Sequence, residues 1–188
     1  HVLVLAGSTR TASLNKKLAR VAAEGARQAG ADVTLLDLRD HPLPLYDGDL
    51  EDAQGVPAPA MELKRLFKAH QGLLLACPEY NSSITGVLKN TIDWVSRPVE
   101  GEAPLEAFKG KVVGLLSASP GALGGLRGLV TVRSILSNIG CLVLPDQVAV
   151  GRAHEAFDEQ GQLKEDKQTK RGHRLAAEVV RVSSKLQA

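Results

Sequence analysis

The segment LAGSTRTASLN, residues 5–15, gathers the side chains best suited to bind an anion. Four hydroxyl residues and Arg10 follow a single glycine, Gly7, directly after a short apolar run. Hydroxyls and a planar guanidinium donate hydrogen bonds, and the start of a following helix would add free backbone N–H groups. These donors fit a terminal phosphate better than a bridging pyrophosphate. The alternative is a plain helix cap by Ser13 beside a solvated arginine.

This segment matches neither of the two common phosphate-binding signatures. The dinucleotide fingerprint G-x-G-x-x-G needs further glycines after Gly7, and the P-loop needs a second glycine followed by lysine. The segment alone therefore predicts an anion site but leaves the ligand open.

A second polar segment, CPEYNSSITG, occupies residues 77–86 after another apolar run. Pro78 fixes the direction of the chain, and residues 80–83 could present backbone amides and an aromatic face to a flat, polar heterocycle. A β-turn followed by a helix cap would explain the same residues. Glu79 has no carboxylate or histidine close to it in the sequence, so we expect a solvent-facing turn residue rather than an acid catalyst.

A third segment, SASPGALGGLRG, occupies residues 117–128. Its glycines allow the backbone to approach a ligand closely. Arg127 could add a charge there or be an exposed helix residue. All three segments are rich in small and polar residues, whereas the loops at the opposite ends of the predicted strands are not.

Short apolar runs alternate with longer helical patterns five times along the chain. Residues 39–59, with four prolines, are expected to form a long loop. The predicted strands are 2–6, 33–38, 72–76, 111–116 and one beginning at 141–144, and the predicted helices are 13–29, 60–70, 87–97, 123–138 and 164–186.

This alternation predicts an α/β fold, with a parallel sheet covered by helices on both faces. Five strands suit the flavodoxin-like three-layer sandwich of strand order 2-1-3-4-5, whose ligands bind beyond the carboxyl ends of the strands. All three polar segments leave those ends, so we expect one ligand site at one edge of the sheet. No repeat or linker interrupts the pattern, and residues 1–188 are expected to form a single domain.

Composition limits the other classes of function. The formal net charge of +2 and the lack of a basic stripe argue against a nucleic-acid partner, and no apolar run is long enough to cross a membrane. Cys77 and Cys141 lie far apart in apolar runs, which favours free thiols in a reducing, cytoplasmic location. The chain begins at His1 without an initiator methionine, so we expect upstream sequence to be missing.

Together the segments resemble the NADPH-dependent FMN reductase family. GSTRTASLN is similar to that family's G-S-x-R-x-x-S-x-N loop, and PEYNSSITGVLKNTIDWVSRP follows its P-E-Y-N-x-S-x-P-G-x-L-K-N-A-I-D-W signature. SPGALGGLR and FDEQGQLKED also follow the family pattern, so the resemblance extends over essentially the whole chain. Thr85 departs from it, because the family usually has proline there, but its hydroxyl can still cap the helix start.

The resemblance implies a flavodoxin-like protein with FMN as its cofactor. Ser8, Arg10, Ser13 and Asn15 would hold the FMN phosphate. The isoalloxazine would be lined, largely through backbone atoms, by Pro78, Glu79, Tyr80, Asn81 and Ser82, and its other side would be closed by Ser117 and Gly121.

The resemblance also implies an enzyme that takes electrons from NADPH, or NADH, and passes them by a ping-pong mechanism to a small-molecule acceptor. Quinones, free flavins, azo dyes and metal oxyanions are the acceptors of the family. The flavin carries the chemistry, so no catalytic side chain and no metal is expected. The alternative is an FMN-binding electron carrier without nicotinamide oxidation. Such carriers tend to be strongly acidic and to sandwich the ring between aromatics, and this chain has only 3% aromatic residues.

Members of the family are commonly dimers or tetramers, so we expect a homodimer or homotetramer. The helix near residues 86–97 is the expected interface, because Trp94 and Val95 could extend its apolar surface. The proline-rich loop 41–51 could then bring Tyr46 to the edge of a partner's flavin. A surface loop beside a core tryptophan is the simpler alternative.

Overall fold

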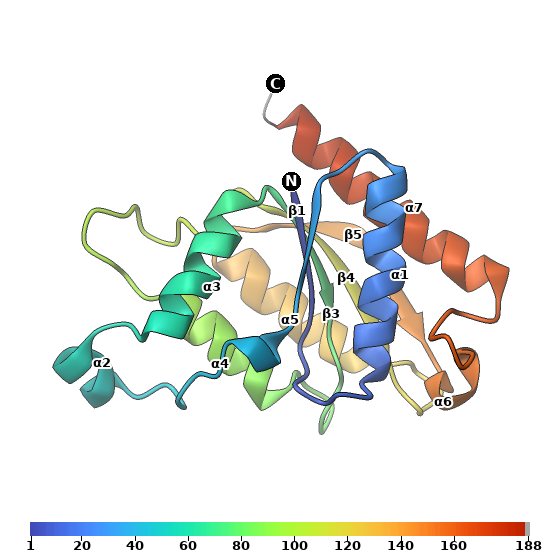
Figure 1. The fold of residues 1–188 in the computed structure, drawn as a ribbon, viewed down its shortest axis with the longest axis horizontal. Coiled ribbons are helices and arrows are strands. Elements are labelled where there is room, and N and C mark those ends of the chain that lie inside the picture. Colours follow the sequence, from blue (N-terminus) through green and yellow to red (C-terminus); the bar gives the residue numbers. More distant parts are fainter. Residues whose placement is uncertain (187–188) are drawn as a thin grey trace.

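A computed structural model describes residues 1–186 and contains one parallel sheet between two layers of helices (Figure 1). Its five strands follow the order β2-β1-β3-β4-β5, which confirms the predicted order. Val2 of β1 lies opposite Val33 of β2 and Gly72 of β3. The strands are β1 (Val2–Ala6), β2 (Val33–Leu36), β3 (Gly72–Ala76), β4 (Val112–Ala118) and β5 (Leu142–Val150).

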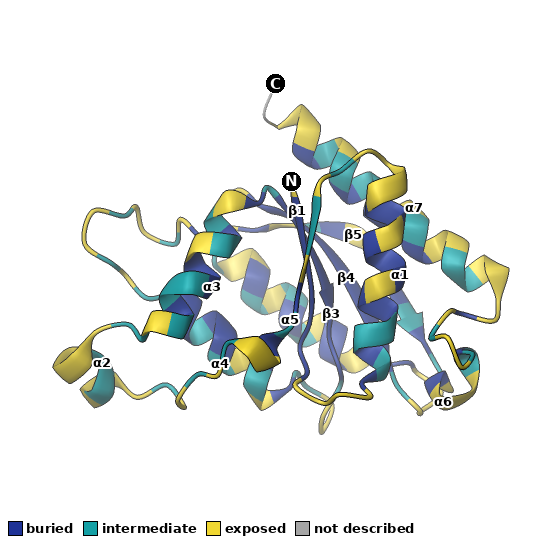
Figure 2. Ribbon diagram, viewed as in Figure 1, coloured by how far each residue is buried: buried dark blue, intermediate teal, exposed yellow. Residues whose placement is uncertain are grey.

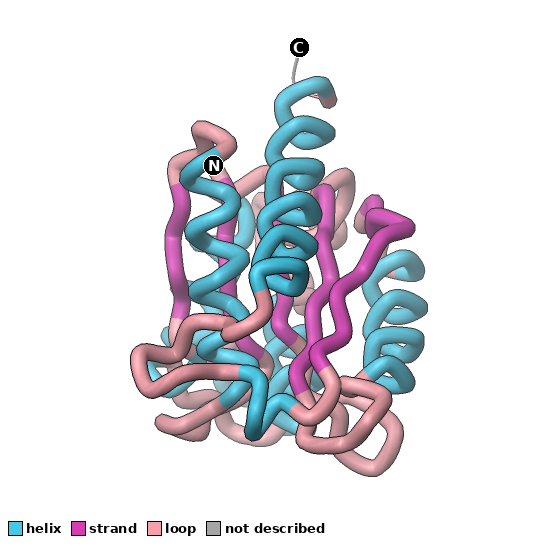
Figure 3. The backbone as a smooth tube through the Cα atoms, turned by 90° about the vertical axis from the view of Figure 1, so that its right-hand side faces the viewer, coloured by secondary structure: helices cyan, strands magenta, loops and turns pink. Residues whose placement is uncertain are grey.

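Helices cover both faces of the sheet (Figures 1 and 3). One face packs against α1 (Leu14–Gln28) and α7 (Asp166–Lys185), and the other against α3 (Ala58–Ala69), α4 (Gly86–Val95) and α5 (Leu126–Asn138). The central strands are therefore buried on both sides, as Figure 2 shows, and this explains why their sequences are continuous apolar runs. No helix within residues 1–186 combines the length and the apolar character needed to span a bilayer.

Several predicted boundaries shift where side chains cap short turns. β2 ends at Leu36 rather than at residue 38, because the Asp37 carboxylate accepts a hydrogen bond from Arg39 N (3.0 Å) and starts the 3₁₀ helix η1 (Leu38–Asp40). The prediction of a continuous loop over residues 39–59 was wrong, since helix α2 (Gly48–Gln54) lies within it. The short helix α6 (Ala153–Ala156) was also not predicted.

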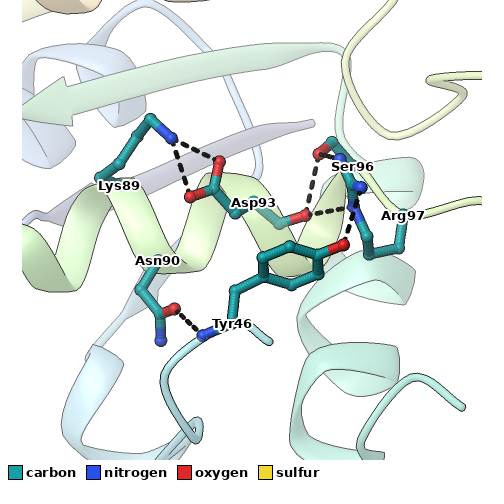
Figure 4. Close-up of polar contacts among 6 residues, drawn as sticks. All are labelled: Tyr46, Lys89, Asn90, Asp93, Ser96 and Arg97. Atoms are coloured by element: carbon teal, nitrogen blue, oxygen red, sulfur yellow. Dashed lines mark hydrogen bonds and ion pairs between the residues drawn. The ribbon is translucent and has the colours of Figure 1, made fainter. Parts of the chain in front are cut away.

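Residues 41–47, here called the strap, run along α4 and are fastened to it (Figure 4). The Pro44 carbonyl accepts hydrogen bonds from Trp94 Nε1 and Asn90 Nδ2, both at 2.8 Å. Tyr46 N donates to Asn90 Oδ1 (2.8 Å). The Arg97 guanidinium lies over the Tyr46 ring, 4.9 Å from its centroid, and donates to its hydroxyl at 3.2 Å.

These contacts overturn the predicted exposed apolar surface on α4. Trp94 and Val95 are both 0% exposed, so the simpler alternative of a core tryptophan is confirmed. Tyr46 is held within its own chain between Trp94 and Arg97. The basis for an interface through this helix is therefore lost.

Candidate functional site

The three polar segments meet in one pocket of about 310 Å³ beyond the carboxyl ends of β1, β3 and β4. These strand ends point toward the lower edge of Figure 1. This is the place predicted for a ligand at the point where the strand order reverses. The pocket is lined by Ser8, Arg10, Ala12, Ser13, Leu14 and Asn15, by Pro78, Glu79 and Tyr80, and by Ala118, Ser119 and Pro120.

Ser8 and Ser13 are buried and present their hydroxyls from the first segment. The Ser8 oxygen accepts a hydrogen bond from Arg10 N (3.2 Å), and the Ser13 oxygen caps α1 by accepting from Lys16 N (3.4 Å). A hydroxyl that accepts can still donate its own hydrogen. The cap is therefore compatible with the predicted anion site, because neither O–H group has an acceptor within residues 1–186.

Arg10 is exposed at the mouth of the pocket, and its guanidinium has no hydrogen-bond or ion-pair partner within residues 1–186. The amino end of α1 lies beside it, where the first backbone N–H groups of a helix lack intrahelical partners. The positive end of the helix dipole adds to the charge of the guanidinium. This side of the pocket therefore carries positive charge and hydrogen-bond donors without partners within residues 1–186.

Asn15 joins the first segment to the third. Its Nδ2 donates to the Ala118 carbonyl at 2.8 Å, and its Oδ1 accepts from Ala118 N at 2.9 Å. The side chain is buried and both ends of its amide are used. Asn15 therefore fixes the start of α1 against the end of β4, which gives it a positioning role in the pocket.

The second segment forms a tight turn with Asn81 and Ser82 at its tip. Their φ angles of 50° and 63°, with paired hydrogen bonds between Tyr80 and Ser83 at 3.0 Å, are typical of a type I′ turn. The tip residues are exposed and do not line the pocket, whereas Pro78, Glu79 and Tyr80 do.

Thr85 links the second segment to the first. Its hydroxyl accepts from Leu88 N (3.2 Å), as expected for the cap of α4, and it also donates to the Gly7 carbonyl (2.7 Å). A proline at this position could make neither bond. The departure from the family motif thus adds a connection between the two loops.

Glu79 differs from the solvent-facing residue that the sequence suggested. Its side chain is only 8% exposed, and its Oε1 accepts from Arg127 Nη2 (2.5 Å) and Nε (2.9 Å). Its Oε2 accepts from Gly128 N (3.1 Å), near the start of α5. Although burial alone would raise the pKa of this carboxyl, the hydrogen bonds from Arg127 and Gly128 hold the pKa below its ordinary value. Among residues 1–186, the one acidic side chain that lines the pocket is thereby paired with a positive charge.

In the third segment, the residues that line the pocket are not the two that were predicted. β4 continues to Ala118, so Ser117 is still a strand residue and is 0% exposed. Its hydroxyl faces Gly125 and not the pocket. Gly121 lies nearby in the loop without lining the pocket, and Ala118, Ser119 and Pro120 take the predicted place of these two residues. If the sequence had shown that β4 extends to Ala118, the residues at and just after this strand end would have been the expected lining.

Neither of the two cysteines lines the pocket. Cys77 and Cys141 are free and buried, and burial raises the pKa of each thiol to about 12. Within residues 1–186 no three His, Cys, Asp or Glu side chains gather as a metal ion would require. Among the described residues, the pocket is thus lined by hydrogen-bond donors, without a thiol or a cluster of metal ligands.

Comparison with known proteins gives concordant results. Residues 1–155 match the family model described as NADPH-dependent FMN reductase. The chain is 37% identical over 167 residues to an NAD(P)H-dependent FMN reductase of Pseudomonas aeruginosa, covering 88% of this chain and 85% of the relative. A quinone reductase of Escherichia coli is 34% identical over 144 residues, covering 77% and 73%. The solved structure of the flavoenzyme NAD(P)H:(acceptor) oxidoreductase from Paracoccus denitrificans superposes with a TM-score of 0.80 at 29% identity, covering 98% and 97%.

Proposed function

The chain belongs to the NADPH-dependent FMN reductase family, and from this premise we propose that the pocket binds FMN and serves an NAD(P)H-dependent oxidoreductase with a small-molecule acceptor. The observation that carries the proposal is the division of the pocket. One side offers free donors for a phosphate, and the other offers a neutralised surface for a flat ring.

The residues present fit FMN at its phosphate end. Ser8 and Ser13 each keep one O–H for donation, and Arg10 adds a fork of N–H groups beside the amino end of α1. Glu79 would repel a phosphate if its charge were free, but Arg127 and Gly128 compensate it. The donor set is therefore matched to a terminal phosphate.

The ring end of the pocket is only lightly covered. Pro78 and Tyr80 approach from one loop and Ser119 from the other, and Tyr80 is 52% exposed. When bound, FMN accepts a hydride from a reduced nicotinamide and then supplies electrons to the acceptor. The role of the chain is to orient the ring and to leave one face accessible for these partners.

Donor and acceptor would use the same space in turn. A pocket of about 310 Å³ that also receives the cofactor leaves little room for two further ligands at once. This supports a ping-pong mechanism with a quinone as the first acceptor to test. An electron carrier without nicotinamide oxidation is the second candidate, which the nearly neutral charge of +2 disfavours.

The test is anaerobic mixing of the FMN-loaded protein with NADPH and with NADH. We expect the flavin absorbance to bleach and to return when a quinone is added, with parallel lines in initial-velocity plots. Pro120→Trp adds bulk at an exposed position on the rim of the pocket, so this variant should still bind FMN but bleach more slowly. The control Pro145→Trp, on β5, should bind FMN and bleach at the wild-type rate. Failure of both nucleotides to bleach the wild-type flavin would leave the electron carrier as the better description.

The proposal includes a homodimer or homotetramer. Three exposed apolar residues support it: Leu126 (39% exposed) and Val130 (64%) in the first turns of α5, and Leu123 (54%) in the turn that precedes the helix. Val130→Asp should shift sedimentation toward the monomer, whereas Leu45→Asp on the strap, where Leu45 is 82% exposed, should not. A wild-type protein that sediments only as a monomer at micromolar concentration would contradict this part.

A further inference from the structure

A second hollow of about 420 Å³ adjoins the cofactor pocket. The two share Arg10, which stands between them. The second hollow takes its other residues from the first segment and from the chain that follows β2. It is lined by Thr9, Arg10, Thr11, Leu38, Arg39 and Pro42.

Arg39 is held at this hollow by the turn that ends β2. Asp37 Oδ1 accepts from Arg39 N (3.0 Å), which fixes the backbone of η1. The Arg39 guanidinium donates through Nη1 to Thr11 Oγ1. Arginine has five N–H donors, so most of this fork has no partner within residues 1–186. The Thr11 hydroxyl, having accepted this bond, keeps its own O–H for donation.

The nearby carboxylates form no ion pair with the Arg39 guanidinium within residues 1–186, although the charge of Arg39 contributes to lowering the pKa of the Asp37 carboxyl. Asp37 Oδ2 pairs with Lys16 Nζ at 2.6 Å. Burial tends to raise the pKa of the Asp37 carboxyl, but hydrogen bonds from Lys16 and Arg39 N lower it overall. Asp40 belongs to the same turn but is not among the residues that line the hollow. Two arginines without ion-pair partners within residues 1–186 thus face one hollow, and Arg39, unlike Arg10, does not line the cofactor pocket.

We propose that Arg39, assisted by Thr11, binds the 2′-phosphate of NADPH and so makes the protein prefer NADPH to NADH. This inference rests on the proposed function, in which Arg10 serves the FMN phosphate. A phosphomonoester presents several oxygens to a planar guanidinium fork and matches it in charge. NADH has no such group, so the same hollow would discriminate between the two nucleotides.

The direct test is calorimetric titration of the FMN-loaded protein with adenosine 2′,5′-bisphosphate and with 5′-AMP. We expect the wild type to bind the bisphosphate at least tenfold more tightly. Arg39→Gln should weaken the bisphosphate about ten- to hundredfold, the range for a lost charge-assisted hydrogen bond. The same variant should bind 5′-AMP with the wild-type affinity. Arg171→Gln, an exposed arginine on α7, is the matched control and should change neither titration.

Steady-state kinetics give the second readout. Arg39→Gln should lower kcat/KM for NADPH by a similar factor and leave kcat/KM for NADH unchanged. Equal binding of the two adenosine nucleotides by the wild type, or equal losses with NADPH and NADH in the variant, would overturn the inference. A tenfold loss of FMN affinity in Arg39→Gln would also overturn it, because the hollow would then serve the cofactor phosphate. The nucleotide titrations need no turnover, so they decide the matter even if the oxidoreductase proposal fails.

Discussion

The two sides of the cofactor pocket treat their charged side chains in opposite ways. In the first segment Arg10 is exposed and its guanidinium donors are free within residues 1–186. Across the pocket, Glu79 and Arg127 neutralise each other, and Glu79 also accepts from Gly128 N. The first side can therefore attract an anion, whereas the other side determines the shape of the space. We therefore expect one loop to supply the binding energy for the anion and the other loops to set the shape of the pocket. Variants on the two sides should affect these two properties separately.

The shape-determining side should be the more sensitive to an added methyl group. Gly125 has a φ of +85°, and a Cβ there would overlap the Ser117 hydroxyl. We expect Gly125→Ala to lower the free energy of unfolding by about 2–5 kcal/mol, from a left-handed non-glycine residue plus overpacking. Urea unfolding followed by circular dichroism measures this. A loss below about 1 kcal/mol would contradict the tight packing of this loop.

Ser117→Ala is the control for that variant. The Ser117 hydroxyl is fully buried without a hydrogen-bond partner within residues 1–186, so its removal should change stability by at most about 1 kcal/mol. In the Ser117→Ala background, Gly125→Ala should lower the free energy of unfolding by less, because the hydroxyl that the new Cβ would overlap is absent. Equal costs in both backgrounds would show that the strain of the backbone alone is responsible.

The attracting side should be the one that controls affinity for the cofactor. We expect Arg10→Ala to weaken FMN binding by about 1.5–3 kcal/mol, the value of a charge-assisted hydrogen bond. Arg127→Ala should weaken it less, because Arg127 does not line the pocket and Gly128 N still donates to the Glu79 carboxylate. Fluorescence titration of FMN into the two apo-variants measures the difference. Equal losses would mean that the phosphate does not lie at Arg10.

Glu79→Gln tests whether the neutralised pair matters for stability. The amide side chain of this variant would keep an acceptor but lose the charge, so we expect a loss of about 1 kcal/mol near neutral pH. The folded-state pKa of Glu79 lies below its ordinary value of 4.5, so its stabilising contribution is complete above that pH and is lost as the pH falls through the lowered pKa. The stability difference between wild type and variant should therefore shrink as the pH falls below 4.5 toward and through the lowered pKa. A difference that does not change as the pH is lowered would argue against the charge pair.

The sequence predicted this molecule best where local pattern and burial agree. The bounds of β1 and β3 follow from apolar runs that are buried on both faces, and the strand order follows from the alternation of five strands with helices, which suits the flavodoxin-like order. The convergence of three segments on one pocket follows from the parallel topology. What could not be predicted depends on contacts distant in sequence, such as Glu79 with Arg127, or on where β4 ends, which placed Ser117 under Gly125.

The strap gives a small expected effect, on stability alone, and the clearest contrast with the pocket. Tyr46 OH donates to Glu51 Oε2 at 2.8 Å and accepts from Arg97 Nη1 at 3.2 Å, while its ring packs against Trp94 with centroids 5.0 Å apart. Tyr46→Phe removes only the hydroxyl, so we expect a stability loss of about 0.5–1.5 kcal/mol. Because these contacts lie within one chain and away from the residues that line the pocket, FMN affinity and bleaching by NADPH should match the wild type. If the variant instead kept its stability but lost affinity for FMN, Tyr46 would have to reach a flavin, and the strap would belong to a site shared between two copies of the chain.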